Sequence, residues 1–143
     1  MLNMISHGNH SGTPLVIAHG LFGSGRNWGV IARRLSDKRR VFTLDMRNHG
    51  SSPWLPDHSY AAMAADLSEV ITKIDKPIDL LGHSMGGKAS MLAALTNAPI
   101  RSLIVADIAP VAYAHTQQTL INAMQALPIA NLSSRRDADA ALE

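Results

Sequence analysis

The sequence contains no cysteine, so a disulfide framework, a thiol nucleophile and a cysteine-based metal site are all excluded. Aromatic residues make up only 4% of the chain, and the formal net charge is only +2. This small charge, carried by dispersed Lys and Arg residues, argues against a nucleic-acid partner. No apolar run approaches the roughly 20 residues that span a bilayer, and residues 1–11 lack the apolar core of a signal peptide. We therefore expect a soluble cytoplasmic protein that has no membrane partner.

What is present is the composition of a folded domain, with 46% apolar and 17% charged residues in a chain of 143. Short apolar runs, typical of strands buried on both faces, occupy residues 15–18, 41–44, 78–81 and 103–106. Three segments have helical spacing. They are residues 28–35, the segment that begins after the candidate N-cap Ser59, and residues 88–95. This alternation predicts an α/β fold, a doubly wound and mostly parallel sheet with helices on both faces.

Gly82, Ser84 and Gly86 form the pattern G-x-S-x-G between the apolar run 78–81 and the helical segment 88–95. The pattern is typical of a nucleophile elbow, a strand-to-helix turn that exposes a serine hydroxyl above a sheet. Such a turn is too tight for a Cβ two positions before or after the serine, and glycine fills both positions. We therefore predict that Ser84 attacks acyl carbonyls.

A glycine-rich segment, residues 19–25, follows the first apolar run. A backbone N–H of such a turn can point at a developing oxyanion. The N–H of Met85, directly after the serine at a helix N-terminus, would be the second donor. A flexible turn without a functional role is the alternative interpretation.

Asp107 ends the last apolar run, at the tip of the strand that follows the serine's strand. A carboxylate there could orient a catalytic imidazole, and a carboxylate that caps a helix is the alternative. None of the histidines stands where the catalytic base is expected; they are His7, His10, His19, His49, His58, His83 and His115. The pair His7 and His10 is too isolated to predict a metal site.

Asp45, Arg47 and His49 follow the second apolar run and have the composition of a catalytic cluster. The same segment contains Asn48 and Gly50, residue types that readily adopt positive φ. We therefore interpret these side chains as a network that braces a sharp turn.

Residues 82–89 also fit G-x-x-x-x-G-K, the phosphate-binding loop, which makes nucleotide binding an alternative hypothesis. Ala89 stands where a Ser or Thr hydroxyl should bind Mg²⁺, and Ser90 comes one residue late. A nucleotide-binding loop would also leave the glycine-rich segment 19–25 without a role. The pattern of residues 82–86 therefore favours the elbow.

Taken together, these segments resemble the α/β-hydrolase superfamily and, within it, the bacterial YbfF-type esterases. The resemblance rests on residues 19–24, 45–50, 82–88 and 107–111, in that order. It implies a mostly parallel eight-stranded sheet, no cofactor and no metal, and hydrolysis of short- to medium-chain acyl esters through an acyl-enzyme. It also implies that residues 1–112 are the N-terminal part of the core domain and that residues 113–143 begin a truncated helical cap.

By position, the resemblance makes Ser84 the nucleophile and Met85 one oxyanion donor. Leu21 is the implied second donor, with Phe22 as the alternative donor. Phe22 and His83 are the implied walls of the substrate pocket.

The resemblance also implies that the catalytic machinery is incomplete. Asp107 matches the catalytic acid of part of the superfamily, whereas in other members the acid follows a later strand, beyond residue 143. The family's catalytic histidine lies in a late loop that this sequence lacks. We therefore expect an N-terminal portion, whether an isolated piece, a cleaved product or half of a split protein, that needs a complementary C-terminal fragment. Alone it should be inactive and poorly soluble, because residues 103–106 would form an exposed apolar edge.

Other functions, both hydrolytic and non-hydrolytic, fit parts of this sequence pattern. A thioesterase or lyase would use the same residues, and a non-catalytic binding domain can be built on the same fold. A haloalkane dehalogenase or epoxide hydrolase would have an aspartate in place of Ser84.

Overall fold

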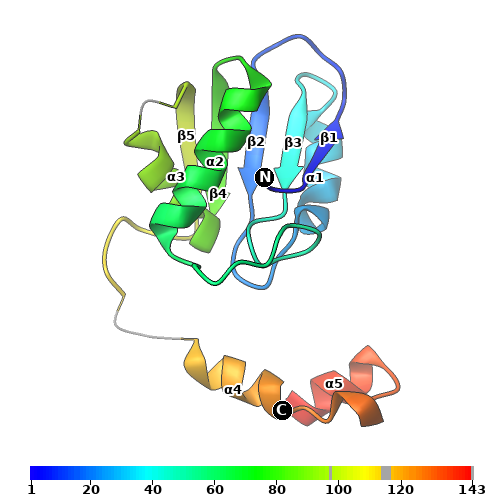
Figure 1. Cartoon of the computed structure of the whole chain (residues 1–143). Coiled ribbons are helices and arrows are strands. Elements are labelled where there is room, and N and C mark those ends of the chain that lie inside the picture. Colours follow the sequence, from blue (N-terminus) through cyan, green and yellow to red (C-terminus); the bar gives the residue numbers. More distant parts are fainter. Residues whose placement is uncertain (97, 114–116, 143) are drawn as a thin grey trace. The chain divides into compact units, whose positions relative to one another are not determined.

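The computed structural model describes residues 1–96, 98–113 and 117–142. The chain divides into two compact units, Met1–Pro110 and Val111–Glu143. The first unit holds a five-stranded sheet with helices packed on it (Figure 1). The second unit consists of α4 (Gln118–Ala126), the short 3-10 turn η2 (Ile129–Asn131) and α5 (Arg135–Leu142). Helical structure after Pro110 is therefore confirmed.

The sheet has the strand order β1-β3-β2-β4-β5. Its strands are β1 (Met4–His7), β2 (Leu15–Ala18), β3 (Val41–Leu44), β4 (Ile78–His83) and β5 (Ile100–Ala106). Strand β1 pairs antiparallel with β3, and all other pairs are parallel, which confirms the predicted mostly parallel sheet. Strand β5 forms one edge of the described sheet, and Ile104 on it is 46% exposed.

The sequence analysis missed β1 because its four residues alternate between exposed and half-buried positions. Such a strand carries no continuous apolar run. The nearby Leu2 is buried in the core, but a single apolar residue is too weak a signal to predict a strand.

Helices cover both faces of the sheet, as predicted. The four side chains of β2 are all buried, and alternate ones enter different clusters: Val16 and Ala18 on one face, Leu15 and Ile17 on the other. The first cluster is completed by α2 (Tyr60–Ile74) and α3 (Met85–Ala94), which lie side by side (Figure 1). The second is completed by Ala32 of α1 (Gly29–Leu35).

The helix boundaries differ from the predicted ones by a few residues. Ser59 caps α2 as predicted, because its Oγ accepts a hydrogen bond from the Ala62 N–H at 3.2 Å. The predicted helix 28–35 begins at Gly29 instead, because Trp28 belongs to a preceding 3-10 turn, η1 (Gly25–Trp28). Helix α3 begins at Met85, three residues before the predicted start, because glycines at its N-terminus hide the helical spacing.

The buried carboxylate of Asp79, near the start of β4, is the centre of a charge network at the end of the strand opposite to Ser84. Arg101 donates to its carboxylate from Nε at 2.8 Å, and the Ser102 hydroxyl donates at 2.5 Å. Arg39 forms an ion pair with the same carboxylate. The hydrogen bond from Arg101, together with those from Ser102 and Arg39, holds the pKa of Asp79 well below its usual range, although burial opposes the change.

We expect Asp79→Asn to weaken the dependence of stability on acid pH. Because the pKa of Asp79 in the folded state lies below its ordinary value of 3.8, its stabilising contribution is present above that value and is lost as pH falls below it. Urea unfolding from about pH 7 to about pH 3 measures this. The wild-type protein should lose more free energy of unfolding over that range than Asp79→Asn, and equal losses would contradict the prediction.

No helix among the described residues is both long enough and apolar enough to cross a bilayer.

Candidate active site

The chemically active side chains gather at the carboxyl ends of the parallel strands. The chain passes from β2 to β3 on one side and later returns to β4 on the other side of β2. In open α/β sheets this change of direction leaves a crevice in which ligands bind. The loop 19–25 that follows β2 and the turn that follows β4 at Ser84 flank this position.

Ser84 stands at the turn between β4 and α3 in a strained backbone conformation, with φ 50° and ψ −117°. Such a conformation costs about 1–3 kcal/mol and persists only where its surroundings hold it. The Ser84 N–H donates to the Ala106 carbonyl at 3.0 Å, and the Ser84 carbonyl accepts from the Lys88 N–H at 3.1 Å. The residue is half-buried, and its hydroxyl has no hydrogen bond to any described residue.

Glycines make this turn sterically possible. A Cβ on Gly82 would lie 2.5 Å from the Gly86 carbonyl oxygen, and one on Gly86 would lie 2.5 Å from the carbonyl oxygens of Ala18 and His19. Both distances are far below van der Waals contact, which confirms the predicted steric requirement. A Cβ on Gly20 would lie 3.2 Å from the Ser84 Cβ, so the loop after β2 packs directly against the serine.

Two backbone N–H groups beside the serine are free. Within the part of the chain that the structure describes, neither the Leu21 N–H nor the Met85 N–H donates a hydrogen bond. Met85 is the first residue of α3, where N–H groups have no partner within the helix. By contrast, the Phe22 N–H donates to His49 Nε2 at 3.2 Å, so Leu21 rather than Phe22 has the free N–H.

A pocket of about 350 Å³ opens between the loop after β2 and the start of α1. Phe22 and His83, the implied pocket walls, both line it, together with Leu21. The sequence analysis missed Trp28 and Ile31, which also line the pocket. Their helical spacing predicts a core face, yet Ile31 is 46% exposed, and the Trp28 ring lies edge-on to His83 at 6.0 Å.

Asp107 follows β5 at the same end of the sheet, in a left-handed conformation with φ 57°. Its side chain is 85% exposed, and Oδ2 lies 3.6 Å from His83 Nε2. The helix-capping alternative is wrong, because the described residues that follow it, 108–113, contain no helix. An exposed carboxylate here is accessible to a group from outside the described residues.

His19 is buried and both of its ring nitrogens are already used. Nε2 accepts the Met46 N–H at 2.9 Å, so the proton is on Nδ1, which donates to the Gly20 carbonyl at 2.7 Å. Burial lowers the pKa of His19. His115 lies outside the described residues, and none of the other histidines is hydrogen-bonded to the Ser84 hydroxyl.

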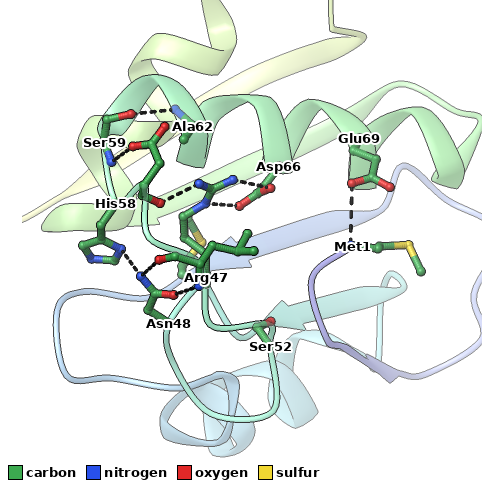
Figure 2. Close-up of polar contacts among 12 residues, drawn as sticks. Met1, Arg47, Asn48, Ser52, His58, Ser59, Ala62, Asp66 and Glu69 are labelled. Atoms are coloured by element: carbon green, nitrogen blue, oxygen red, sulfur yellow. Dashed lines mark hydrogen bonds and ion pairs between the residues drawn. The ribbon is translucent and has the colours of Figure 1, made fainter.

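The segment after β3 is the predicted turn-bracing network. Arg47 donates to both carboxylate oxygens of Asp66 on α2, at 2.6 and 2.8 Å, and to the Asp57 carbonyl at 2.7 Å (Figure 2). The bond to Asp66 raises the pKa of Arg47. Asn48, with φ 63°, joins the same turn to His58 and Leu55 (Figure 2).

Asp45 ties three segments together. Its carboxylate accepts the Gly25 N–H at 2.8 Å, the Ser51 N–H at 2.9 Å and the Asn3 side-chain amide at 2.9 Å. Burial alone would raise the pKa of Asp45, but these hydrogen bonds outweigh it and lower the pKa. Because both carboxylate oxygens are engaged and the residue is buried, Asp45 holds the loop after β2 in place, as expected of a structural brace.

No three His, Asp or Glu side chains in the described ranges come together as a metal site. His7, one of the histidines weighed as a ligand, lies within hydrogen-bond distance of Thr43, with 3.2 Å between Nε2 and Oγ1.

Comparisons with known proteins identify the family of this fold. The model of the alpha/beta hydrolase family matches residues 15–142. Esterase YbfF of Escherichia coli is 50% identical over 107 residues, covering 73% of this chain and 42% of that protein. The sn-1-specific diacylglycerol lipase ABHD11 of Danio rerio is 43% identical over 129 residues, covering 85% of this chain and 40% of that protein.

Among solved structures, a marine microorganism esterase superimposes with a TM-score of 0.90 at 40% identity, covering 99% of this chain and 57% of that chain. The chain spans less than half the length of the two curated relatives. The matched family model covers most of the sequence, including both glycine-rich turns. This chain therefore belongs to the alpha/beta hydrolase family.

Proposed function

We propose that this chain is the nucleophile-bearing part of a serine hydrolase that acts on carboxylic acyl esters. One observation carries the proposal: Ser84 is strained and half-buried, and among the described residues neither its hydroxyl nor the adjacent N–H groups of Leu21 and Met85 have a hydrogen-bond partner. That arrangement is what a nucleophile elbow with an oxyanion hole requires, and it supports the proposal. The names of the relatives, an esterase and a diacylglycerol lipase, support the same reaction class.

In the proposed mechanism, Ser84 Oγ attacks the acyl carbonyl and gives its proton to a histidine. The N–H groups of Leu21 and Met85 stabilise the oxyanion of the tetrahedral intermediate. The histidine then protonates the leaving alcohol, and an acyl-enzyme remains on Ser84. Water, deprotonated by the same histidine, attacks this ester and releases the carboxylic acid and the free serine.

We propose that the histidine comes from a complementary C-terminal segment outside these 143 residues. The exposed carboxylate of Asp107 would orient its imidazole in this proposal. The edge strand β5 is the surface on which that segment would add strands, because its outer backbone groups have no partner strand in the described sheet.

The pocket supports short- to medium-chain acyl groups as substrates. Leu21, Phe22, Trp28 and Ile31 give it apolar walls, and its volume is about 350 Å³. Small-molecule sites of this kind are typically apolar with few polar groups.

A series of p-nitrophenyl esters tests the proposal on this chain co-expressed with the C-terminal part of a relative. We expect turnover of the acetate, butyrate and octanoate esters, with little turnover of the palmitate. A folded complex that hydrolyses none of them would contradict the proposal and favour a binding domain on this fold. Faster turnover of the matching thioesters would identify a thioesterase instead.

A further inference from the structure

We infer that His49 is a positioning residue. It holds the loop 19–25 in the conformation in which the Leu21 N–H is the loop's oxyanion donor. The inference rests on the proposed function. It adds a role for a residue that the sequence analysis assigned only to a turn brace, and it selects between the two candidate donors.

The tautomer of His49 follows from its two hydrogen bonds. Its Nε2 is 3.2 Å from the Phe22 nitrogen, whose N–H can only donate, so Nε2 must be the unprotonated acceptor. Its Nδ1 is 2.8 Å from the Arg47 carbonyl oxygen, which can only accept, so Nδ1 carries the proton. The neutral ring therefore joins the loop after β2 to the loop after β3.

Phe22 needs such a partner because its backbone is strained. Its φ of 61° lies in the left-handed region, which is unfavourable for a residue with a bulky side chain. Two hydrogen bonds from backbone N–H groups help to close the turn: the Phe22 N–H to His49, and the Gly23 N–H to the Gly20 carbonyl at 3.0 Å. Without the first, Phe22 could relax to negative φ, and the loop that carries the Leu21 N–H would lose its fixed conformation.

His49 itself is held rigidly. It is only 9% exposed, and its ring lies edge-on to His19, with 5.0 Å between the centroids. Arg47, which supplies the carbonyl acceptor, is fixed by its paired bonds to Asp66. The His49 imidazole therefore connects the rigid turn after β3 to the loop that carries the Leu21 N–H.

Amide hydrogen exchange tests this contact independently of any activity. In His49→Ala the Phe22 amide should exchange at least about tenfold faster than in the wild-type protein, because its acceptor is gone. The Gly25 amide, which donates to Asp45, should keep its protection and so report that the loop is still folded. Unchanged exchange at Phe22 would overturn the inference.

Kinetics of the complemented enzyme test the consequence. His49→Ala should lower kcat by about tenfold to a hundredfold, since losing an oxyanion donor costs about 10²–10³ in kcat. KM should change much less, because the pocket walls remain. His49→Gln, whose side-chain oxygen can accept the Phe22 N–H, should recover part of kcat and covers the case in which the alanine variant fails to fold.

His58→Gln is the matched control, since His58 contacts His49 but not Phe22, and it should stay within about twofold of wild type. An unchanged kcat in a variant whose Phe22 amide has lost protection would overturn the inference while leaving the proposed function intact. A wild-type complex without esterase turnover would instead refute the proposed function. The exchange measurement would still show whether His49 accepts the Phe22 N–H.

Discussion

Replacing Ser84 with alanine is expected to lower kcat for a p-nitrophenyl ester by about 10⁴-fold or more in the complemented protein. In the proposed mechanism this hydroxyl forms the acyl-enzyme, and it makes no hydrogen bond to any described residue. Folding should be unaffected for the same reason. Steady-state kinetics and thermal unfolding of the two proteins measure both halves of this prediction.

Ser90→Ala provides the matched control for that experiment. Ser90 lies on the same helix, α3, and is fully buried, and its hydroxyl has no partner among the described residues. Its removal should leave kcat within about twofold of wild type, and stability should be equal or slightly higher, because an unsatisfied buried hydroxyl is lost. Equal turnover by Ser84→Ala and wild type would end the proposed mechanism.

Gly86→Ala is expected to lower the free energy of unfolding by about 3 kcal/mol and to abolish turnover. The new Cβ would lie 2.5 Å from the carbonyl oxygens of Ala18 and His19, which are backbone atoms at the end of β2. Those atoms cannot move without separating α3 from the sheet, and Ser84 would move with the helix. Urea unfolding and ester hydrolysis measure the two effects.

Gly29→Ala is the control for the glycine effect. Gly29 begins α1 with a right-handed φ of −57°, and a Cβ there would come no closer than 3.8 Å to its nearest neighbour, the Arg33 side chain. The same substitution should therefore raise stability by about 0.5–1 kcal/mol. A Gly86→Ala protein as stable as Gly29→Ala would show that the turn tolerates a Cβ after all.

The sequence predicts those parts of the fold that depend on near neighbours. Strand β2 is predicted because four consecutive apolar residues are buried on both faces, and the Ser59 cap is predicted because its partner is three residues away. The need for glycine at positions 82 and 86 follows from the geometry of a single turn. These signals are local, so one sequence is enough to show them.

The features that the sequence does not predict are set by contacts between distant segments. The bond from Phe22 to His49 joins residues 27 positions apart, and no local pattern specifies it. The pocket-lining role of Trp28 also depends on where α1 lies relative to the loop after β2. Strand β1 is specified by its pairing with β3 rather than by its own sequence.

Covalent labelling tests directly whether the half-buried Ser84 hydroxyl is a nucleophile beside the Leu21 and Met85 amides. The complemented protein is treated with a fluorophosphonate, digested and analysed by mass spectrometry. We expect one stoichiometric adduct on Ser84, and none in Ser84→Ala. A folded complex that stays unlabelled, or that is labelled on another residue, would contradict this expectation.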